Sequence, residues 1–300
     1  MKKHTLKDWL IVTRYWSFSV STMPVLATFA YLFSERLLPG GVKPYLILLL
    51  CLVSVVLLHA AGNVLSDWYD YKRGVDSENA YAVPNLVFHH FEPVEYLRFS
   101  IILFIIGALS GICIALLSGP ALWIIGGVGV LLTLLYSFLK YHALGDLDIF
   151  VIFGVLTVIG TAYAVTGVLH WDALVLSLPI GLITVSVLHA NNTLDTSTDR
   201  AAGIKTFAML IGGKASSVLY CAYMIIPFLC VIAAVAVGRL HPLALICLVA
   251  GILAWRNLQQ ARKYNKLGTD AMKGLDQASA KLQMVFSLLL SLGLFLSVLL

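Results

Sequence analysis

The stretch PYLILLLCLVSVVLLHAAGNVLS, residues 44–66, contains no Asp, Glu, Lys or Arg and is long enough to cross a lipid bilayer as a helix. A spanning helix needs about 20 predominantly apolar residues in succession. Backbone groups cannot hydrogen-bond to lipid, and the alternation of polar and apolar residues typical of a membrane β-barrel is not seen. The stretch is therefore predicted to be a transmembrane helix. Eight similar runs lie at 15–33, 99–118, 121–139, 149–169, 173–190, 217–238, 241–256 and 284–300.

The composition agrees with a protein embedded in lipid. Of the 300 residues, 60% are hydrophobic and 12% are charged, whereas a soluble domain has about 45–50% apolar and about 25% charged residues. A soluble globular protein is thereby excluded. No small-x-small cleavage site clearly follows the first run, so we expect that run to stay as a helix. The predicted fold class is all-α, a polytopic membrane protein of about nine transmembrane helices, in one domain (1–300) with Asp-rich loops at about 63–95 and 191–216.

The charged residues predict which side of the membrane each loop faces. With nine spans and the N-terminus inside, all but three of the 20 Lys and Arg residues are cytoplasmic, as the positive-inside rule requires. The exceptions are Arg36, Lys43 and Arg239, and the only acidic residues outside are Glu35 and Asp172. We expect an integral, multi-pass protein of a bacterial inner (plasma) membrane, with its N-terminus and acidic loops in the cytoplasm.

An acidic motif follows the run at 44–66. It reads Asn63-Val-Leu-Ser-Asp67-Trp-Tyr-Asp70 and continues to Gly74 and Asp76. On a continuing helix, Asn63, Asp67 and Asp70 are spaced i, i+4 and i+7, which places the three side chains on one face.

A second acidic motif follows the run at 173–190. It reads Asn191-Asn192-Thr-Leu-Asp195-Thr-Ser-Thr-Asp199 and continues to a glycine four residues later. Asn192, Asp195 and Asp199 again share a helix face, at i, i+3 and i+7. Both motifs follow a Leu-His-Ala step, and both have a glycine four residues after the last spaced Asp. This weak internal repeat predicts two similar elements that face one pocket.

Two acidic faces across a cleft predict a cation site. Carboxylates on one face repel each other unless a cation compensates them, and charge is costly near the hydrocarbon. Mg²⁺ accepts one or two carboxylates and takes its other ligands from water and phosphate oxygens, so a magnesium-bound diphosphate fits between the motifs. Alternatively, the acids only solvate the loops and pair with nearby cations; two matched loops favour the first interpretation. Basic side chains that can contact phosphate are Lys72, Arg73, Arg200 and Lys205.

Two more segments carry polar side chains at the ends of apolar runs. Tyr136 and Lys140 close the fourth run at i and i+4, so a phenol and an ammonium can reach the same phosphate. Tyr and Lys are also common interfacial anchors at such positions. The first run begins Arg14-Tyr-Trp16-Ser-Phe-Ser-Val-Ser21-Thr-Met-Pro24, where Ser and Pro residues predict a polar-lined kink.

Together these motifs resemble the UbiA superfamily of intramembrane prenyltransferases, most closely its branch of 1,4-dihydroxy-2-naphthoate (MenA-like) and animal vitamin K2-forming enzymes. The resemblance covers nearly the whole chain, and its most specific parts are the second Asp motif and the Leu-Gly-Asp-Leu stretch. The matching segments are Trp16-Ser-Phe-Ser, Asp67/Asp70/Gly74/Asp76, Tyr136/Lys140, Leu144-Gly-Asp-Leu, Phe153-Gly, Gly160-Thr-Ala-Tyr163, Asn191-Asn-x-x-Asp195-x-x-x-Asp199-Arg-x-x-Gly203 and Asn265-Lys-Leu.

The resemblance implies a nine-helix α-fold with a central cavity that opens sideways to lipid and is capped by the cytoplasmic loops. It implies that the Asp motifs bind Mg²⁺ and the diphosphate of a polyprenyl donor, and that an aromatic acceptor is alkylated. In the naphthoate branch the acceptor also loses its carboxyl group, which gives demethylmenaquinone in menaquinone (vitamin K2) biosynthesis. The expected partners are a polyprenyl diphosphate, 1,4-dihydroxy-2-naphthoate and the lipid bilayer, with no nucleic acid.

The residues and the resemblance together give each candidate an expected role. The metal ligands are expected to be Asn63, Asp67, Asp70, Asn192, Asp195 and Asp199. Lys140, with Tyr136 beside it, is expected to neutralise the leaving diphosphate, and Asp76 or Asp146 to help the acceptor lose a proton or CO₂. Contacts to diphosphate or acceptor are expected from Arg14, Asn63, Lys72, Arg73, Asp76, Asp146, Tyr163, Asn191, Asn192, Arg200 and Lys205. Aromatic faces for the allylic cation are expected from Trp68, Tyr69, Tyr71 and Tyr163.

The first motif departs from the family pattern in two ways. Ser66 stands where Asn is usual, so Asn63, one turn earlier, is expected to replace it as a ligand. The segment after the motif lacks the usual Arg, which leaves Lys72, Arg73 and Arg14 as candidates for completing the phosphate site.

Two other functions remain open on the sequence alone. A non-enzymatic carrier or channel with acidic cation sites is one, although such a path needs acids in the middle of helices and none lies there. The other is a family member with a different acceptor, such as homogentisate, 4-hydroxybenzoate or haem.

Overall fold

The structure, a computed structural model, describes residues 4–75 and 85–299. These residues are mostly helical, and no β-strand occurs among them. The predicted all-α class with nine spans is confirmed. The segments that are long and apolar enough to cross a membrane within the described residues are Tyr15–Ser34, Lys43–Lys72, Pro93–Ser118, Ala121–Tyr141, Gly145–Thr166, Trp171–Leu194, Gly213–Ala236, Pro242–Met272 and Leu275–Leu296.

The individual helices follow one another with short connections. The α-helices are α1 (Leu6–Val12), α2 (Ser19–Ser34), α3 (Lys43–Lys72), α4 (Pro93–Ser118), α5 (Ala121–Tyr141), α6 (Gly145–Ile149), α7 (Thr157–Thr166), α8 (Ser177–Leu194), α9 (Thr196–Ala201), α10 (Phe207–Ile211), α11 (Gly213–Ala236), α12 (Gly251–Ala261), α13 (Tyr264–Leu267) and α14 (Leu275–Leu296). Short 3-10 helices cover Tyr15–Ser17, Trp171–Leu176, Pro242–Ala250 and Gly268–Met272, and a π-helix covers Phe150–Leu156.

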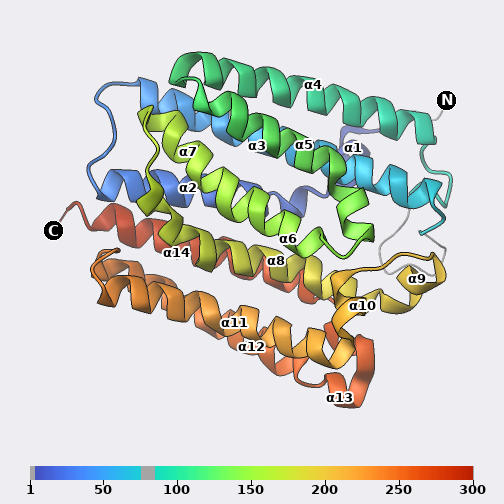
Figure 1. Cartoon of the computed structure of the whole chain (residues 1–300). Coiled ribbons are helices and arrows are strands. Elements are labelled where there is room, and N and C mark those ends of the chain that lie inside the picture. Colours follow the sequence, from blue (N-terminus) through green and yellow to red (C-terminus); the bar gives the residue numbers. More distant parts are fainter. Residues whose placement is uncertain (1–3, 76–84, 300) are drawn as a thin grey trace.

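The long helices lie side by side with their axes roughly aligned (Figure 1). α14 packs against α2 and α8, and α3 packs against α4. The largest core cluster draws on α2, α8, α11 and α14, with fully buried side chains such as Leu32, Ile180 and Phe286. α5 lies at the margin of this core, because Ser137 is the single buried residue of that helix.

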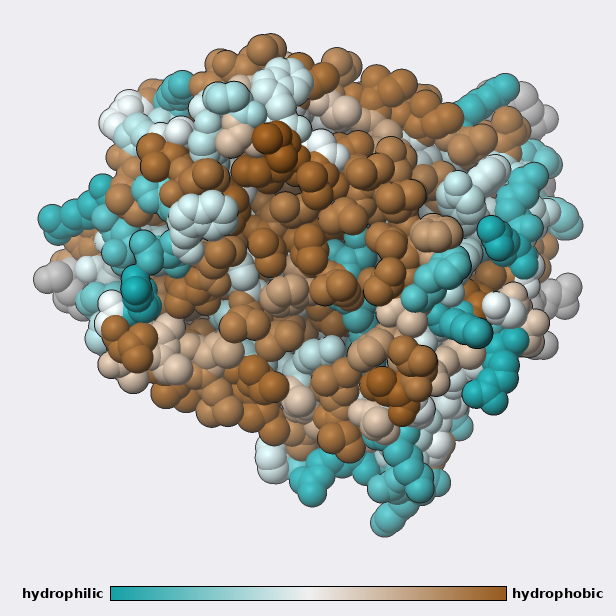
Figure 2. Space-filling view, in the orientation of Figure 1, coloured by the Kyte–Doolittle hydropathy of each residue, from teal (hydrophilic) through white to brown (hydrophobic). Residues whose placement is uncertain are grey.

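The outer surface is apolar over most of its area. α4 alone exposes Ile101, Ile105 and Leu109. Figure 2 shows hydrophobic residues across the middle of one face and hydrophilic residues gathered at its margins. A surface of this kind is stable against lipid tails and would aggregate in water. The chain is therefore a multi-pass membrane protein.

Several helices extend beyond the predicted runs. α3 continues past residue 66 to Lys72, so the helical spacing of the first acidic motif is real. α14 begins at Leu275 rather than at 284, because polar residues of its first turns, such as Gln283, are buried inside the protein. α4 begins at Pro93 rather than at 99, where a capping box between Glu92 and Glu95 and the proline start the helix.

Both acidic motifs end in the same backbone turn. Gly74 has φ +66° and Gly203 has φ +74°, a left-handed conformation that glycine adopts without steric cost. The next N–H in each case donates back to the carbonyl of the last Asp, from Val75 to Asp70 at 2.9 Å and from Ile204 to Asp199 at 3.0 Å. This 6→1 bond is that of a Schellman ending. The repeat noted in the sequence is thus a repeat of local structure.

Candidate active site

The acidic motifs lie on helix ends that meet at one end of the molecule. The last turns of α3 and α5, and the α8–α9 junction, gather on the side of Figure 1 where α9 and α10 are labelled. The backbone N–H of Lys205, after α9, donates to the carbonyl of Tyr141 at the end of α5 at 3.2 Å. A side-chain contact between Lys140 and Asp70 joins α5 to α3. The three helix ends are therefore tied into one unit.

The carboxylates of the first motif are each paired with a cation. Lys140 Nζ lies 3.4 Å from one oxygen of Asp70, and the Tyr141 hydroxyl donates to the other. Asp67 forms an ion pair with Arg14, from the turn that precedes α2. Asp70 is buried, so its charge needs this compensation. In the absence of ligands the first motif is thus held by a lysine, an arginine and a phenol.

The second motif has oxygen atoms without donors. Asp199 and Asn192 are buried, and Oδ2 of Asp199 and Oδ1 of Asn192 have no hydrogen-bond partner among the described residues. Burial raises the pKa of Asp195 and of Asp199 from 3.8 to about 6, although the ammonium of Lys140 acts in the opposite direction. Buried oxygen atoms that lack hydrogen-bond donors are suited to bind a metal cation.

The set of side chains fits Mg²⁺ shared with a ligand. Carboxylate and amide oxygens are ligands of hard divalent cations. Within 4–75 and 85–299, no three His, Cys, Asp or Glu side chains lie close enough to enclose a metal without help. Mg²⁺ commonly takes one or two carboxylates and completes its shell with water and substrate phosphates. The unpartnered oxygens of Asp199 and Asn192 agree with that arrangement. They are too few to surround a metal without water or substrate oxygens.

Asp146 lies behind the second motif. Its carboxylate is 2.6 Å from Nδ1 of His189 and 3.5 Å from Nδ2 of Asn192. Because the amide nitrogen of Asn192 faces Asp146, its oxygen points away from that carboxylate. The sequence predicted that Asp146 contacts the diphosphate or the acceptor; in the structure its carboxylate contacts His189 and Asn192, and it does not line the cavity. Asp146 begins the fifth span, and Gly154 and Gly181 bring that span close to α8, since a Cβ on Gly154 would lie 3.2 Å from Gly181 Cα.

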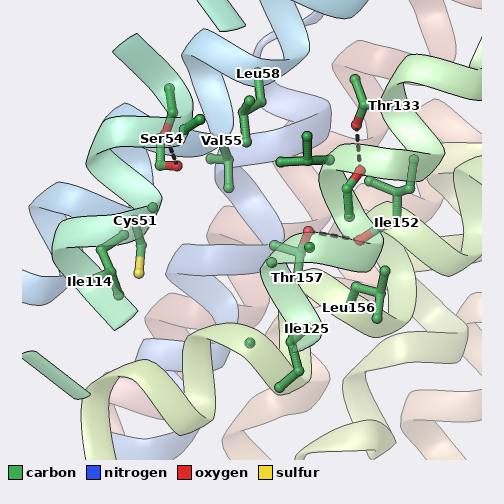
Figure 3. A pocket seen from close by; sticks show the side chains of 18 of the residues that line it. Cys51, Ser54, Val55, Leu58, Ile114, Ile125, Thr133, Ile152, Leu156 and Thr157 are labelled. Atoms are coloured by element: carbon green, nitrogen blue, oxygen red, sulfur yellow. Dashed lines mark hydrogen bonds between the residues drawn. The ribbon is translucent and has the colours of Figure 1, made fainter. Parts of the chain in front are cut away.

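An apolar cavity of about 430 Å³ begins next to the acidic motifs. Asn63 and Tyr136, each one turn from an acidic or basic group of the site, line one part of it, and Cys51 and Ile114 line another. The walls come from α3, α4, α5 and the π-helix with α7, and Figure 3 shows Leu58, Ile152 and other apolar side chains along them. No Asp, Glu, Lys or Arg occurs among the described lining residues. The cavity suits a hydrocarbon group attached to a charged head.

A family model, described as the UbiA prenyltransferase family, matches residues 21–297. The chain belongs to this family. The resemblance seen in the motifs is therefore confirmed, and the chain is a member of a family of membrane prenyltransferases.

Curated relatives of this UbiA-family chain carry the same family name. UbiA prenyltransferase domain-containing protein 1 of Mus musculus is 33% identical over 305 residues, which cover 98% of this chain and 86% of the relative. Its Homo sapiens counterpart is 34% identical over 300 residues, which cover 97% and 84%. These relatives are animal proteins, so the expected bacterial plasma membrane receives no support.

Solved structures of UbiA homologs share the fold. A UbiA homolog from Aeropyrum pernix matches with a TM-score of 0.71 at 18% identity, over 95% of this chain and 98% of that one. A UbiA homolog from Archaeoglobus fulgidus, described as bound to GPP and Mg²⁺, matches with a TM-score of 0.65 at 13% identity, over 97% and 99%. The likeness extends over almost the whole length of each chain.

Two aromatic candidates of the UbiA-family chain occupy different places. Tyr136 lines the cavity beside the site. Tyr163 does not: its hydroxyl oxygen lies 2.7 Å from the position that a Cβ on Gly119 would take, in the connection between α4 and α5. That connection is at the far end of α5 from Lys140, so Tyr163 cannot contact a diphosphate held there. The structure thus speaks against a diphosphate contact for Tyr163 and leaves the acceptor contact a prediction, because a motif match gives a position in the chain but not its depth.

The basic candidates surround the site at different distances. Arg73 stacks over the ring of Tyr141 at 6.0 Å, next to Asp70, and Lys72 lies over the ring of Trp68 at 5.7 Å. Trp68 and Tyr71 pack in a separate cluster with Phe91 and Tyr96 rather than on the cavity. Arg200 and Lys205 are exposed near the second motif.

The two remaining amide candidates, Asn63 and Asn191, also differ in their surroundings. Nδ2 of Asn63 donates to the Thr13 carbonyl at 3.0 Å and to Ser17 Oγ at 3.4 Å. Asn191 is half-buried on the last turn of α8. Asp76 lies outside the described residues.

Sequence reasoning missed two residues of the site. Tyr141 follows Lys140 directly and bonds Asp70, but a tyrosine at a helix end gave no signal beyond interfacial anchoring. His59 lines the cavity four residues before Asn63. His59 precedes Asn63 by the same i, i+4 spacing that links Asn63 to Asp67. This spacing could have indicated that His59 lies on the same helix face.

Proposed function

We propose that this prenyltransferase uses Mg²⁺ to transfer a polyprenyl group from its diphosphate to 1,4-dihydroxy-2-naphthoate, with loss of the acceptor's carboxyl group as CO₂. The observation that carries the proposal is the position of two acidic motifs and Lys140 beside an apolar cavity. The Archaeoglobus homolog described as bound to GPP and Mg²⁺ supports the choice of donor and cation. The resemblance to the naphthoate branch supports the choice of acceptor.

Different residues would have different roles in the release of the diphosphate. Asp67, Asp70, Asp195 and Asp199, with the amide oxygens of Asn63 and Asn192, would hold Mg²⁺. When bound, the metal supplies charge neutralisation to the leaving diphosphate. With Asp70 and Asp67 as metal ligands, Lys140 and Arg14, which pair with them here, would donate to phosphate oxygens of the diphosphate. The cations that pair with the carboxylates in this structure are thus the ones that would bind the diphosphate.

The cavity supports a donor that stays in the membrane. Burial of each CH₂ contributes about 0.8 kcal/mol, so a 20-carbon tail binds lipid by well over ~10 kcal/mol and is not released into water. Apolar walls also exclude water, which would otherwise capture the allylic cation. The carrier interpretation has less support, because the described lining residues include no Asp, Glu, Lys or Arg along which a cation could travel.

We also propose that residues 1–300 act as one domain whose N-terminus and acidic motifs face the cytoplasm. The excess of Lys and Arg at that end supports this orientation. A cysteine at an exposed position near α9 should react with an impermeant maleimide from the cytoplasmic side only. Labelling from the opposite side would reverse the orientation.

The experiment is a transfer assay with the protein in liposomes. We expect geranylgeranyl diphosphate, Mg²⁺ and 1,4-dihydroxy-2-naphthoate to give prenylated naphthoquinol and CO₂, and EDTA or Asp195→Ala to abolish it. Activity retained in EDTA would overturn the magnesium mechanism. Activity with homogentisate or 4-hydroxybenzoate alone would overturn the acceptor and leave prenyl transfer standing.

A further inference from the structure

We propose that His59 binds the ring hydroxyl of the aromatic acceptor and takes up its proton during transfer. This inference rests on the proposed function above. His59 lines the cavity from α3, on the helix face that carries Asn63 and Asp67. Eight residues of α-helix rise about 12 Å, so the imidazole lies deeper in the membrane than Asp67 by about that distance.

Two serine side chains hold the imidazole. Nδ1 of His59 lies 3.1 Å from Oγ of Ser21, and Nε2 lies 3.5 Å from Oγ of Ser17. Both hydroxyls already donate to backbone carbonyls, Ser17 to Arg14 at 2.8 Å and Ser21 to Phe18 at 3.1 Å. Because a hydroxyl has a single proton to donate, each serine presents a lone pair to the ring. The shorter contact assigns the imidazole proton to Nδ1.

Nε2 then has one long contact, at 3.5 Å, to Ser17 Oγ, a hydroxyl that already donates to a backbone carbonyl. In the neutral ring the nitrogen that carries no proton offers a lone pair, and Ser17 Oγ has no proton to give it. No other donor to Nε2 is found among the described residues. A polar atom beside an apolar cavity whose only contact is this long gains free energy when a ligand supplies a shorter hydrogen bond. The structure therefore provides a place for a hydroxyl group.

The second Leu-His-Ala step offers an internal comparison. His189 is fully buried, its Nδ1 lies 2.6 Å from Asp146 and its Nε2 lies 2.8 Å from Ser216 Oγ. Both of its nitrogens have partners, and it does not line the cavity. The same local sequence thus gives one structural histidine and one histidine with a nitrogen available to a ligand.

Hydroxyl, thiol and phenol groups in the cavity wall are poorer proton acceptors than a neutral imidazole. The hydroxyls of Ser54, Thr133 and Thr157 donate to carbonyls of Gly107, Gly129 and Ile152 at 3.1, 2.8 and 2.8 Å (Figure 3). Cys51 and Tyr136 also line the cavity, but a neutral thiol or phenol is a much poorer proton acceptor than a neutral imidazole.

Aromatic rings flank the imidazole, and one of them, that of Phe153, also lines the cavity. The rings of Phe153 and Phe18 have their centroids 5.2 and 5.8 Å from that of His59. Their π-faces favour a positive charge on the imidazole once it has taken a proton. In that doubly protonated form, both nitrogens can donate to the lone pairs of Ser17 and Ser21.

The step balances without an added reagent. The ring carbon that carries the carboxylate attacks the allylic carbon, the C–O bond to the diphosphate breaks, and the diphosphate leaves with the electron pair. The hydroxyl next to the attacked carbon gives its proton to Nε2 and becomes a carbonyl. When CO₂ leaves, the electron pair of the broken C–C bond returns to the ring, the carbonyl becomes a hydroxyl again, and His59 returns the proton. No net proton is consumed.

The test compares variants of His59 in the liposome assay with 1,4-dihydroxy-2-naphthoate and geranylgeranyl diphosphate. In His59→Gln the amide can accept a hydrogen bond but not a proton. We expect kcat to fall about 100- to 10,000-fold, with KM for the prenyl diphosphate changed less than about twofold, because that donor is bound elsewhere. A kcat within threefold of the unmodified protein would overturn the proposal.

A second measurement does not depend on turnover. Inhibition constants are compared for 1-hydroxy-2-naphthoate and for 2-naphthoate, which lacks the hydroxyl. We expect the unmodified protein to prefer the hydroxylated inhibitor at least tenfold and His59→Leu to lose that preference. An unchanged preference in His59→Leu would overturn the proposal. If the unmodified protein alkylates no phenolic acceptor, the proposed function fails instead, and the two failures are thereby distinguished.

Ser21→Ala tests the positioning of the ring. Loss of the Nδ1 partner should lower kcat about tenfold and raise KM for the acceptor, with KM for the prenyl diphosphate unchanged. Thr28→Val on the same helix is the matched control, since its hydroxyl also donates to a helix carbonyl, that of Pro24 at 2.8 Å, away from the cavity. Equal effects of the two variants would overturn the role of Ser21.

Discussion

Lys140 connects the two acidic motifs through charge. Its ammonium bonds Asp70 directly and lowers the pKa of Asp195 and Asp199 across the site. A single cation thus keeps carboxylates of both motifs closer to their ionised form. An ammonium is also a compact charge that can move from a carboxylate to a phosphate when a ligand arrives.

Removal of the Lys140 ammonium should lower the activity that depends on both acidic motifs. In Lys140→Gln we expect kcat to fall about 100- to 1,000-fold, the usual effect of losing one group that stabilises charge in the transition state. Lys214→Gln, an exposed lysine at the start of α11, is the control and should stay within twofold. Equal activity of the two variants in the liposome assay would contradict the role of Lys140.

The second motif should make magnesium activation depend on pH. The pKa of Asp195 and Asp199 is raised from 3.8 to about 6, so protons compete with the cation for these carboxylates as the pH falls through 6. We expect the Mg²⁺ concentration for half-maximal activity to rise at least tenfold between pH 7.5 and 5.5. The folded state binds these protons more tightly than the unfolded state, so the two groups favour folding more at pH 5 than at pH 7. A requirement for Mg²⁺ that does not change over this range would contradict the assignment.

Side-chain chemistry could be predicted from the sequence better than side-chain direction. The motif spacing correctly put Asn63, Asp67 and Asp70 on one helix, because helical periodicity is a local property. It did not show that Asp146 faces His189, since that contact joins residues far apart in the chain. The depth of Tyr163 could not be predicted for the same reason: it depends on where its helix begins and which neighbours it meets.

At the level of helices, length and apolar content were enough to find every span but not its ends. Polar residues near the start of α14 or the end of α3, such as Gln283 and Asp70, are buried inside the protein rather than exposed to lipid, so hydropathy alone underestimates the length of these helices. The span Pro242–Met272 also breaks into 3-10 and α-helical pieces. Hydropathy cannot distinguish these forms, because each satisfies its own backbone hydrogen bonds.

The paired glycine endings should carry a measurable share of stability. Gly74→Ala and Gly203→Ala each place a Cβ at positive φ, where no heavy atom lies within 4 Å, so the cost is that of the backbone conformation. We expect each to destabilise the protein by about 1–2 kcal/mol and to lower the melting temperature in detergent. Gly40→Ala is the control, because its added Cβ also meets nothing within 4 Å and its φ is not positive. A lower melting temperature for Gly40→Ala than for Gly74→Ala would contradict this account.

Across the whole molecule, the charged groups of the candidate active site lie at one end. The cavity extends from them into the apolar interior. The fold class followed from the sequence because nine apolar runs have few alternative arrangements in a bilayer. The shape of the cavity did not follow, because it depends on how α3, α4, α5 and α7 pack, and small residues in their walls leave no sign of their orientation in the sequence.

This separation of the two ends predicts a tolerant position. Tyr163→Phe removes a hydroxyl beside Gly119, at the end of the molecule opposite to Lys140. We expect kcat and both KM values to stay within twofold, with at most a small decrease in melting temperature. A tenfold loss of activity at unchanged melting temperature would place Tyr163 in the catalytic site after all.

The ion pair between Arg14 and Asp67 has a consequence for the order in which ligands load. While the guanidinium covers this carboxylate, free metal must displace it without compensation and binds weakly. A diphosphate gives the guanidinium a new anionic partner and so releases the carboxylate to the metal. We therefore expect the two ligands to bind cooperatively, and by thermodynamic linkage each would raise the affinity for the other by the same factor. Mg²⁺ alone should then bind weakly until the lipid diphosphate is present.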